Sequence, residues 1–277
     1  MTYTDANHEN WNDRAKCHHE SSEVRDLLAK LRRGQSTLKE IETNLLGDVK
    51  GKKILHLMCH NGLDSISLAL KGATVTAVDL SEESLNYANK YAASLGVEGI
   101  EFVLGDVHHE LDCIDRQFDI VFMTYGVLCW LNDLRTVFSH AAQYLKNRGQ
   151  LLLIDHHPFL DLLDCQNNEL KLTGEYFYDP VPEKCISTTS YIGSGQLTNP
   201  TTYQWSHNIG NIIEAIVASG FAIEHFGEYP WSDYQRYPCL IKREGKYHLP
   251  ENMTQIPMLF SLLALKDATK AVSAIAR

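Results

Sequence analysis

The chain has 277 residues, a formal net charge of −10 and a hydrophobic fraction of 44%. This length suits one large α/β domain with an elaboration or two small domains, and the hydrophobic fraction is ordinary for a protein with a buried core. Nucleic-acid phosphates attract clusters of lysine and arginine, and the sequence has only short basic pairs. Nucleic acid is therefore a poor candidate for a partner.

Membrane insertion and secretion are also disfavoured. The first ten residues are polar, and no apolar run approaches the roughly 20 residues needed to cross a bilayer. The seven cysteines are scattered and form no Cys-x-x-Cys pair, which argues against a disulfide framework or a thiolate zinc site. We expect a cytoplasmic protein, and no spacing of acidic residues predicts a metal site.

Helical and strand-like patterns alternate along the first 156 residues. Residues 1–50 are predicted to be helical, with helices around Trp11–Arg14, over residues 22–31 and from Ser36. The expected strands that follow cover residues 52–58, 74–78, 100–104, 118–123 and 150–155, and the expected helices cover residues 62–70, 81–96 and 133–145. This alternation predicts a parallel sheet with helices on both faces.

The pattern changes after residue 157. Residues 158–205 are rich in tyrosine, threonine, asparagine, glycine and proline, which indicates β-hairpins or loops and not another strand–helix unit. A helix is then expected from Ser206 to the glycine at 220, a strand over residues 221–226, loops over residues 229–250 and a last strand over residues 256–265. The sheet would thus have seven strands.

The turn between the first strand and its helix is the most informative stretch. A ligand can approach the backbone where side chains are small, and Gly62 meets that need. A dinucleotide fingerprint requires the pattern G-x-G-x-x-G, and the stretch 58–64 has one glycine. The turn therefore disfavours NAD and leaves a nucleoside with an amino acid or phosphate end as the better ligand.

Two aspartates follow neighbouring strands. Asp79 ends the second expected strand, where a carboxylate can accept hydrogen bonds from both hydroxyls of a ribose. Asp106 ends the third, where it could accept from an adenine amino group. Each aspartate could instead only flank a helix start or form a turn.

These segments resemble the motifs of class I S-adenosylmethionine-dependent methyltransferases. The matching stretches are Ile54–Gly62, Ala77–Ser81, Gly105–Val107, Phe118–Tyr125 and Leu145–Leu153. The resemblance covers residues 40–156 well. It implies a Rossmann-like, seven-stranded, mostly parallel sheet with helices on both faces, elaborated by N-terminal helices and an aromatic-rich cap insertion.

Other segments are similar to a bacterial subgroup of small-molecule enzymes within this class. They are Leu55–Gly62, Gly126–Leu131, His157–Phe159 and Tyr203–His207. The resemblance divides the chain into a helical segment covering the cofactor site, the cofactor-binding core, the cap insertion and the C-terminal part of the sheet, over residues 1–50, 51–157, 158–205 and 206–277.

The resemblance implies S-adenosylmethionine as the cofactor and S-adenosylhomocysteine as its product. The backbone after the first strand would meet the methionine end, and Arg14 could pair with the cofactor carboxylate or lie on a helix surface. The cofactor-binding residues that it implies are Cys59, His60, Gly62, Asp79, Leu80, Asp106, Val107, Thr124, Trp11 and Arg14.

Three residues depart from the wider family. His56 stands where most members have an acid that helps to hold the amino group of the cofactor, and Met58 and His60 stand where most have glycine. His56 would hold the amino group differently, or through water. We expect a slightly altered loop that still binds the cofactor.

Methyl transfer requires alignment of a nucleophile with the methyl group, and an oxygen or nitrogen nucleophile can also need a base. The candidates at the carboxyl edge of the sheet are His156, His157 and Tyr125, although His157 could only orient the turn before Pro158. The candidate substrate-pocket residues are Trp130, Tyr203, Trp205 and His207. Further aromatic residues of the insertion could wall the same pocket or form a dimer contact, namely Tyr176, Phe177, Tyr178 and Tyr191.

We therefore expect a methyltransferase that acts on an oxygen or nitrogen atom of a small molecule such as a secondary metabolite. The alternative is a protein of the same fold that binds S-adenosylmethionine without transferring its methyl group. An RNA methyltransferase would need a basic groove, which the acidic balance disfavours. A monomer and a homodimer are both compatible with the sequence.

Overall fold

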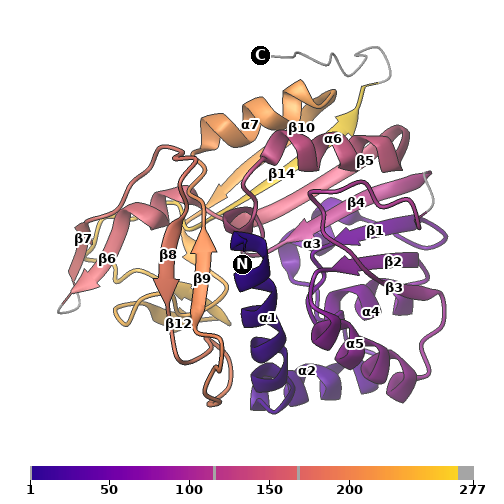
Figure 1. Ribbon diagram of the computed structural model, residues 1–277, viewed down its shortest axis with the longest axis horizontal. Helices are drawn as coiled ribbons and strands as arrows, with labels where there is room; N and C mark the ends of the chain where they lie inside the picture. Colours follow the sequence, from indigo (N-terminus) through magenta and orange to yellow (C-terminus); the bar gives the residue numbers. More distant parts are fainter. Residues whose placement is uncertain (1, 115–116, 167–168, 268–277) are drawn as a thin grey trace.

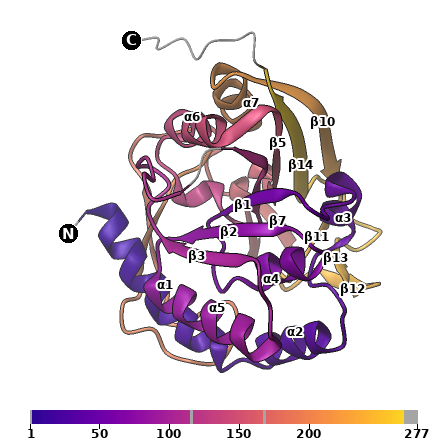
Figure 2. The same ribbon diagram turned by 90° about the vertical axis from the view of Figure 1, so that its right-hand side faces the viewer.

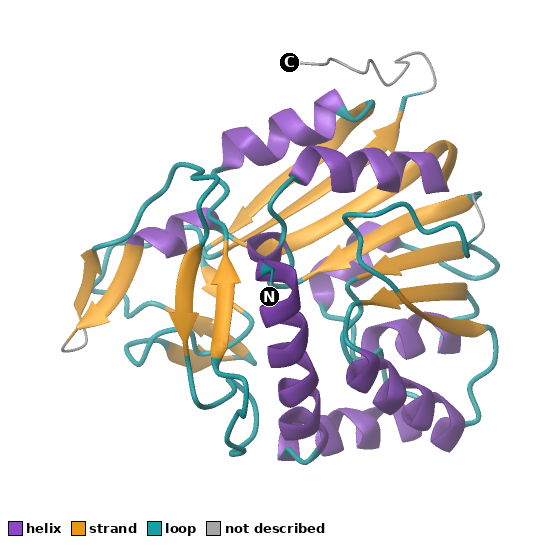
Figure 3. Ribbon diagram, viewed as in Figure 1, coloured by secondary structure: helices purple, strands orange, loops and turns teal. Residues whose placement is uncertain are grey.

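A seven-stranded sheet forms the centre of the molecule (Figures 1 and 3). The computed structural model describes residues 2–114, 117–166 and 169–267. The strands of the sheet are β1 (Lys53–Leu57), β2 (Thr74–Asp79), β3 (Ile100–Leu104), β4 (Phe118–Thr124), β5 (Leu145–His156), β10 (Phe221–Tyr229) and β14 (Leu259–Lys266). They lie in the order β10-β14-β5-β4-β1-β2-β3.

Six of the seven strands run in the same direction, and β14 alone runs in the opposite one. Strand β1 pairs in parallel with β2 and β4, β2 pairs with β3, and β4 pairs with β5. Strand β14 is antiparallel to both of its neighbours, β5 and β10. The predicted seven-stranded, mostly parallel sheet is confirmed, and the order of strands reverses between β1 and β4, where an α/β sheet opens a crevice at the carboxyl ends of its strands.

Helices cover both faces of the sheet, as Figure 2 shows from the side. They are α1 (Tyr3–His19), α2 (Ser22–Arg32), α3 (Glu40–Leu46), α4 (Leu63–Leu70), α5 (Glu82–Leu95), α6 (Leu134–Tyr144) and α7 (Ile209–Ala218). Successive side chains of a strand point to opposite faces. Leu55 and Leu57 of β1 therefore pack in one core with α6 and α7, and Ile54 packs in the other with α3 and α4.

Local capping explains where several elements begin. The Ser81 hydroxyl accepts a hydrogen bond from the Ser84 amide at 3.0 Å and caps α5. The helix predicted from Ser36 is wrong at its start, because α3 begins at Glu40. The Thr37 amide donates to the Ser67 hydroxyl at 2.9 Å, and this bond holds the preceding segment against α4 in a non-helical conformation.

Strand β5 also begins earlier than predicted. It starts at Leu145, which pairs with Phe118, and the register shifts before Gln150 pairs with Ile120. Arg148 lies within this irregular stretch with a φ of 62°. The gap left between the expected helix over residues 133–145 and the expected strand over residues 150–155 is therefore a distorted part of the strand and not a separate loop.

The predicted hairpins of the insertion are confirmed. Strands β6 (Leu163–Gln166) and β7 (Glu169–Leu172) pair with each other, as do β8 (Glu183–Ile186) and β9 (Thr201–Gln204). The loops predicted over residues 229–250 are partly wrong, since β11 (Trp231–Ser232), β12 (Ile241–Arg243) and β13 (Lys246–His248) form a small antiparallel sheet. Short 3₁₀ helices, η1 (Leu128–Trp130) and η2 (Pro158–Leu162), complete the fold.

Helix α1 runs between the β8–β9 hairpin and the helices of the parallel half of the sheet (Figure 1). The side-chain amide of Asn7 donates to the Tyr203 carbonyl, and its oxygen accepts from the Tyr203 amide, both at 2.8 Å. The Asn199 amide donates to the Asp13 carboxylate at 2.6 Å. The beginning of the chain and the insertion thus cover the same side of the molecule. Within the part of the chain that the structure describes, no helix is long and apolar enough to span a membrane.

Candidate functional site

A cavity of about 270 Å³ lies at the carboxyl ends of the parallel strands. Residues that follow β1, β2, β3 and β4 line it, and helix α1 and the insertion contribute residues from the covering side. The cavity therefore occupies the crevice that the reversal of strand order creates. Of the implied cofactor-binding residues, those that line the cavity are Trp11, Cys59, His60, Asp79, Leu80, Asp106, Val107 and Thr124.

The loop after β1 holds an unusual backbone. Met58, His60 and Gly62 have φ values of 58°, 53° and 70°, in the left-handed region. The two non-glycine residues therefore adopt the backbone conformation that glycine adopts most readily, at a cost of about 1–2 kcal/mol each. The loop therefore differs from a glycine-rich loop in its side chains, whereas its backbone adopts the conformation that glycine favours.

Gly62 itself does not line the cavity. A Cβ atom there would lie 2.6 Å from the Phe102 ring and 2.9 Å from Ala88, so a side chain would collide with β3 and α5. Glycine is therefore needed at this position so that the loop can pack against its neighbours. It was expected to make room for a ligand.

Asp79 joins the loop to the second strand. Its carboxylate accepts hydrogen bonds from the backbone amides of His60 at 2.7 Å and Ser81 at 2.9 Å. Burial raises the pKa of Asp79 to about 6, although these hydrogen bonds act in the opposite direction. The side chain lines the cavity at the end of β2, where the sequence analysis expects a carboxylate that accepts from a ribose.

Asp106 lies at the end of β3 in the same wall of the cavity. Its Oδ1 accepts hydrogen bonds from the amide of His108 at 3.0 Å and from the imidazole Nδ1 of His108 at 2.8 Å. At Gly105 a Cβ atom would lie 2.6 Å from Leu111, so glycine allows this strand end to pack closely. His108 and Gly105 also line the cavity, and the sequence argument did not single out either as a cavity residue.

Helix α1 supplies a buried cation beside the cavity. Arg14 is 9% exposed, and its guanidinium lies over the rings of Trp11 and Tyr191 at 5.5 and 5.7 Å. Its Nε donates to Asn10 at 2.6 Å, and no carboxylate pairs with it among the described residues. A buried cation without a counter-charge is costly, which favours an anionic ligand at this position.

Two histidines connect α1 to the loop after β1. The Nδ1 of His18 lies 3.0 Å from the Nε2 of His60, and the Nε2 of His18 lies 2.6 Å from the Ser190 hydroxyl. Burial, followed by the nearby positive charge of Arg14, lowers the pKa of His60 to about 4. Burial likewise lowers the pKa of His18 to about 2, so both rings are neutral near pH 7.

The loop after β4 is held by Asp155 at the end of β5. Asp155 is 3% exposed, and its Oδ2 accepts from the amides of Val127 at 3.0 Å and Leu128 at 2.9 Å. Its Oδ1 accepts from the amides of Gly126 and His156. One carboxylate therefore fixes the loop that carries the cavity residues Tyr125 and Trp130, the latter being one of the predicted pocket residues.

Tyr125 lines the cavity, and its hydroxyl is engaged by a buried acid. Its hydroxyl donates to the Glu42 carboxylate at 3.1 Å, and the Lys39 ammonium lies 3.9 Å from its ring centroid. Burial, followed by the negative charges of Glu42 and Asp233, raises the pKa of Tyr125. The tyrosine is therefore a hydrogen-bond donor near neutral pH, and the sequence-based candidacy of Tyr125 as a base is not supported by its surroundings.

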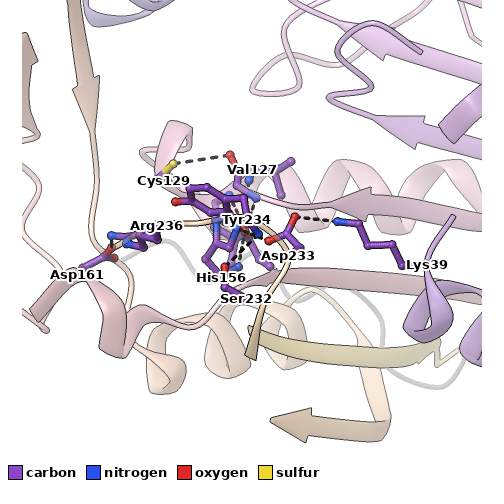
Figure 4. A network of polar contacts seen from close by, with 12 residues as sticks. Lys39, Val127, Cys129, His156, Asp161, Ser232, Asp233, Tyr234 and Arg236 are labelled. Atoms are coloured by element: carbon purple, nitrogen blue, oxygen red, sulfur yellow. Dashed lines mark hydrogen bonds and ion pairs between the residues drawn. The ribbon is translucent and has the colours of Figure 1, made fainter. Parts of the chain in front are cut away.

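His156 and Asp233 point toward each other in Figure 4, with Lys39 reaching the aspartate from the opposite side. The His156 Nε2 lies 3.1 Å from Asp233 Oδ1, and the Lys39 ammonium lies 2.8 Å from Oδ2. Burial alone would raise the pKa of Asp233, but the hydrogen bond from His156 and the charge of Lys39 hold it below its usual range. The other edge of the ring faces Gly126, where a Cβ atom would lie 3.6 Å from Nδ1.

His157 has a structural position. Its Nδ1 accepts a hydrogen bond from the Phe159 amide at 3.1 Å and caps η2, while its Nε2 lies 2.9 Å from Glu228. It does not line the cavity, and neither does His156, which lies beside the wall residue Gly126. The geometry agrees with the alternative stated above, that His157 orients the turn before Pro158.

Three predicted pocket residues lie outside the cavity. Tyr203 packs on Tyr3, and the indole N–H of Trp205 donates to the Pro180 carbonyl at 3.3 Å. His207 donates to the Leu131 carbonyl at 2.6 Å. The contacts of these three side chains therefore hold the end of the insertion and the segment after it against neighbouring parts of the fold. The insertion instead contributes Tyr191 and Ile192 to the cavity wall.

Three acids near the cavity are not predicted from the sequence, namely Glu42, which is buried, and Asp64 and Asp233, which are half-buried. Asp64, in the first turn of α4, lines the cavity, and Glu42 of α3 lies behind it against Tyr125. Their sequence signal was weak because both resemble ordinary acids at a helix start. Asp233 comes from a loop that no pattern connected to the sheet edge.

The chain is similar to known methyltransferases in sequence. Residues 54–149 match a family described as a methyltransferase domain. A methyltransferase-named protein of Bacillus subtilis (strain 168), YqeM, is 38% identical over 110 residues, which are 39% of this chain and 43% of that protein. A ubiquinone biosynthesis O-methyltransferase of Erwinia tasmaniensis is 30% identical over 152 residues, which are 54% of this chain and 59% of the relative. The chain thus spans about half the length of these relatives.

Solved structures show the same fold. An S-adenosylmethionine-dependent methyltransferase from Mesorhizobium loti is 22% identical, with a TM-score of 0.59 over 81% of this chain and 95% of that one. The fold likeness therefore extends beyond the segment that the family covers, into the helices and strands on either side. Residues 54–149 are thus similar to a methyltransferase domain, and the fold of the chain is that of a solved S-adenosylmethionine-dependent methyltransferase.

Proposed function

We propose that this chain transfers the methyl group of S-adenosylmethionine to an oxygen or nitrogen atom of a small-molecule acceptor. The observation that carries the proposal is the cavity at the strand ends, where Asp79 and the unpaired cation Arg14 lie within or beside the wall of a methyltransferase domain. The oxygen acceptor has support from the relative named for O-methylation in ubiquinone biosynthesis.

The residues present fit this cofactor. Asp79 would accept from the ribose diol and Asp106 from the adenine amino group, while the guanidinium of Arg14 would pair with the carboxylate. When bound, S-adenosylmethionine supplies a methyl group on a positively charged sulfur. Thr124 and Trp130 line the same cavity and would wall the space in which donor and acceptor align.

We further propose His156 as the base for an acceptor that must lose a proton. With Nε2–H donating to Asp233, Nδ1 keeps its lone pair on the ring edge that faces Gly126, a residue of the cavity wall. A proton taken up at Nδ1 would lie near Asp155, whose Oδ1 is 3.8 Å away, and the two carboxylates would stabilise the imidazolium. Asp233 is a positioning residue in this scheme.

The proposal also assigns a role to the segments that cover the site. Residues 1–50 and the insertion over residues 158–205 would enclose the cofactor on the core formed by residues 51–157. Tyr191 would offer an aromatic surface to the acceptor, which supports a ring-bearing small molecule. The seven cysteines are free, which supports a reducing, cytoplasmic setting.

Calorimetric titration with S-adenosylmethionine, S-adenosylhomocysteine and NAD tests the cofactor. The wild type should bind the first two and not NAD, and Asp79→Asn should weaken that binding about tenfold or more. Asp119→Asn serves as the control, because Asp119 accepts from Lys53 and Lys146 away from the cavity wall and its loss should leave binding unchanged. Absence of binding by the wild type would refute the proposal.

Transfer is tested separately with isotopically labelled S-adenosylmethionine and small-molecule extracts. Methylated product should form with the wild type and His157→Asn, and its rate should fall at least a hundredfold with His156→Asn while cofactor binding persists. Binding without product from any extract would favour the alternative of a non-catalytic binding protein.

A further inference from the structure

The cavity wall beside β1 carries a half-buried carboxylate with one oxygen that makes no hydrogen bond among the described residues. Asp64 lines the cavity from the first turn of α4, and its Oδ1 accepts a hydrogen bond from the Thr37 hydroxyl at 2.5 Å. Its Oδ2 has no hydrogen-bond partner within the described part of the chain. An ionised carboxylate can accept hydrogen bonds at both oxygens, so Oδ2 of Asp64 can accept from a donor in the cavity.

A second acid near Asp64 shows that this side of the cavity lacks a compensating cation among the described residues. Glu42 is 1% exposed, its Oε2 accepts from the Tyr125 hydroxyl, and its Oε1 has no hydrogen bond. Burial, followed by the negative charge of Asp64, raises the pKa of Glu42 to about 7. The site therefore disfavours a second negative charge and favours a cation from outside.

The nearest cation of the chain is already engaged. The Lys39 ammonium forms its ion pair with Asp233 at 2.8 Å and lies over the Tyr125 ring. Arg14 lies elsewhere, between Trp11 and Tyr191 on the covering side. The cavity thus offers an unpaired anion in one part of its surroundings and an unpaired cation in another, a complement to a zwitterionic ligand.

His56 cannot supply the negative charge on this side. It is 2% exposed, its Nδ1 lies 2.7 Å from the Ser65 hydroxyl, and burial lowers its pKa to about 3. A neutral imidazole can donate or accept a hydrogen bond but cannot neutralise an ammonium group.

We propose that Asp64 binds the ammonium group at the amino acid end of the cofactor, while Arg14 binds the carboxylate of that end. The inference rests on the proposed function, since it assigns residues to the ammonium and the carboxylate at the amino acid end of S-adenosylmethionine. It makes Asp64 a specificity residue that distinguishes the complete cofactor from adenosine compounds without an amino acid end.

Asp64 could instead only stabilise the fold. An acid in the first turn of a helix interacts favourably with the helix dipole, and the bond to Thr37 ties residues 36–39 to α4. A structural role of this kind would weaken every ligand of the cavity alike. A role in binding the ammonium would weaken only ligands that carry one.

The test compares two ligands on two variants by calorimetry. S-adenosylhomocysteine carries the amino acid end, and 5′-methylthioadenosine shares its adenosine and sulfur but lacks that end. Asp64→Asn should weaken S-adenosylhomocysteine about 10- to 100-fold and change 5′-methylthioadenosine less than threefold. Thr37→Val removes the partner of Asp64 and keeps its charge, so it should bind both ligands within threefold of the wild type.

Each outcome has one meaning when unfolding temperatures are measured on the same samples. Selective loss of S-adenosylhomocysteine by a folded Asp64→Asn variant supports the inference. Equal loss of both ligands, or unchanged binding of S-adenosylhomocysteine, overturns it and leaves the proposed function intact. Failure of the wild type to bind either ligand overturns the proposed function and the inference with it.

Discussion

Replacing Asp155 with asparagine should loosen the loop that follows β4. Each carboxylate oxygen of Asp155 accepts two backbone hydrogen bonds, Oδ1 from Gly126 and His156 and Oδ2 from Val127 and Leu128. An asparagine must place its NH₂ group at one of these two positions. In either orientation an N–H donor would then face two other donors, and the side chain is too buried for water to intervene.

The expected loss of stability follows from the hydrogen bonds that Asp155 accepts. Hydrogen bonds to a charged group contribute about 1.5–3 kcal/mol, and the substitution removes the charge and two acceptor contacts. We expect the free energy of unfolding to fall by about 3 kcal/mol. With an unfolding entropy of about 2.1 cal/mol/K for each residue, this loss corresponds to a decrease in melting temperature of about 5 °C.

Thermal and urea unfolding would measure this change, and Asp119→Asn is the matched control. Asp119 also accepts from a backbone amide and a lysine, but it is partly exposed and its neighbours can turn to solvent, so a loss below about 1 kcal/mol is expected. Equal losses in the two variants, or an Asp155→Asn protein as stable as the wild type, would refute the argument that the carboxylate holds the loop.

Other features lead to further predictions. Burial raises the pKa of Glu42 from 4.5 to about 7, so the native state retains a proton that the unfolded state releases, and the free energy of unfolding should fall as the pH rises from about 4.5 to 7. Glu42→Gln should remove that dependence and exceed the wild type by about 1–3 kcal/mol in urea unfolding at pH 8, and a less stable variant would contradict the assignment. Gly62→Ala should lower the free energy of unfolding by about 3 kcal/mol, because its Cβ would lie 2.6 Å from Phe102. Gly96 has a similar φ of 62° and open space around it, so Gly96→Ala should lower the free energy of unfolding by only about 1 kcal/mol. Equal losses in urea unfolding would show that packing is not the reason. Arg14→Met should weaken S-adenosylhomocysteine about tenfold without changing 5′-methylthioadenosine, and calorimetry that finds both ligands unchanged would remove Arg14 from the site.

The alternation of apolar segments predicted most of the central sheet, because buried parallel strands must be apolar and short. It did not reveal the early start of β5 at Leu145, since a distorted strand and a turn share the same residue types. The short strands β11–β13 were also missed, because aromatic residues in a loop and in a small sheet look alike in sequence.

Some residues of the site can likewise be predicted from the sequence, and others cannot. Residues at strand ends, such as Asp79 and Asp106, could be placed because the end of a parallel strand fixes where the next side chain lies. Residues of the insertion could not, because their direction depends on contacts between distant segments. Trp205 turns to the Pro180 carbonyl while Tyr191 turns to the cavity, and nothing in their local sequence distinguishes the two.

The paired hydrogen bonds between Asn7 and Tyr203 have a consequence for ligand exchange. The side-chain amide of Asn7 imitates a neighbouring strand, because it satisfies both the N–H and the carbonyl of one residue on the free edge of β9. Lifting helix α1 away would leave that edge without a partner, and unpaired strand edges readily join those of other molecules. A protein that opens at α1 to exchange its ligand would therefore be most prone to self-association during exchange, and tight ligand binding would protect it.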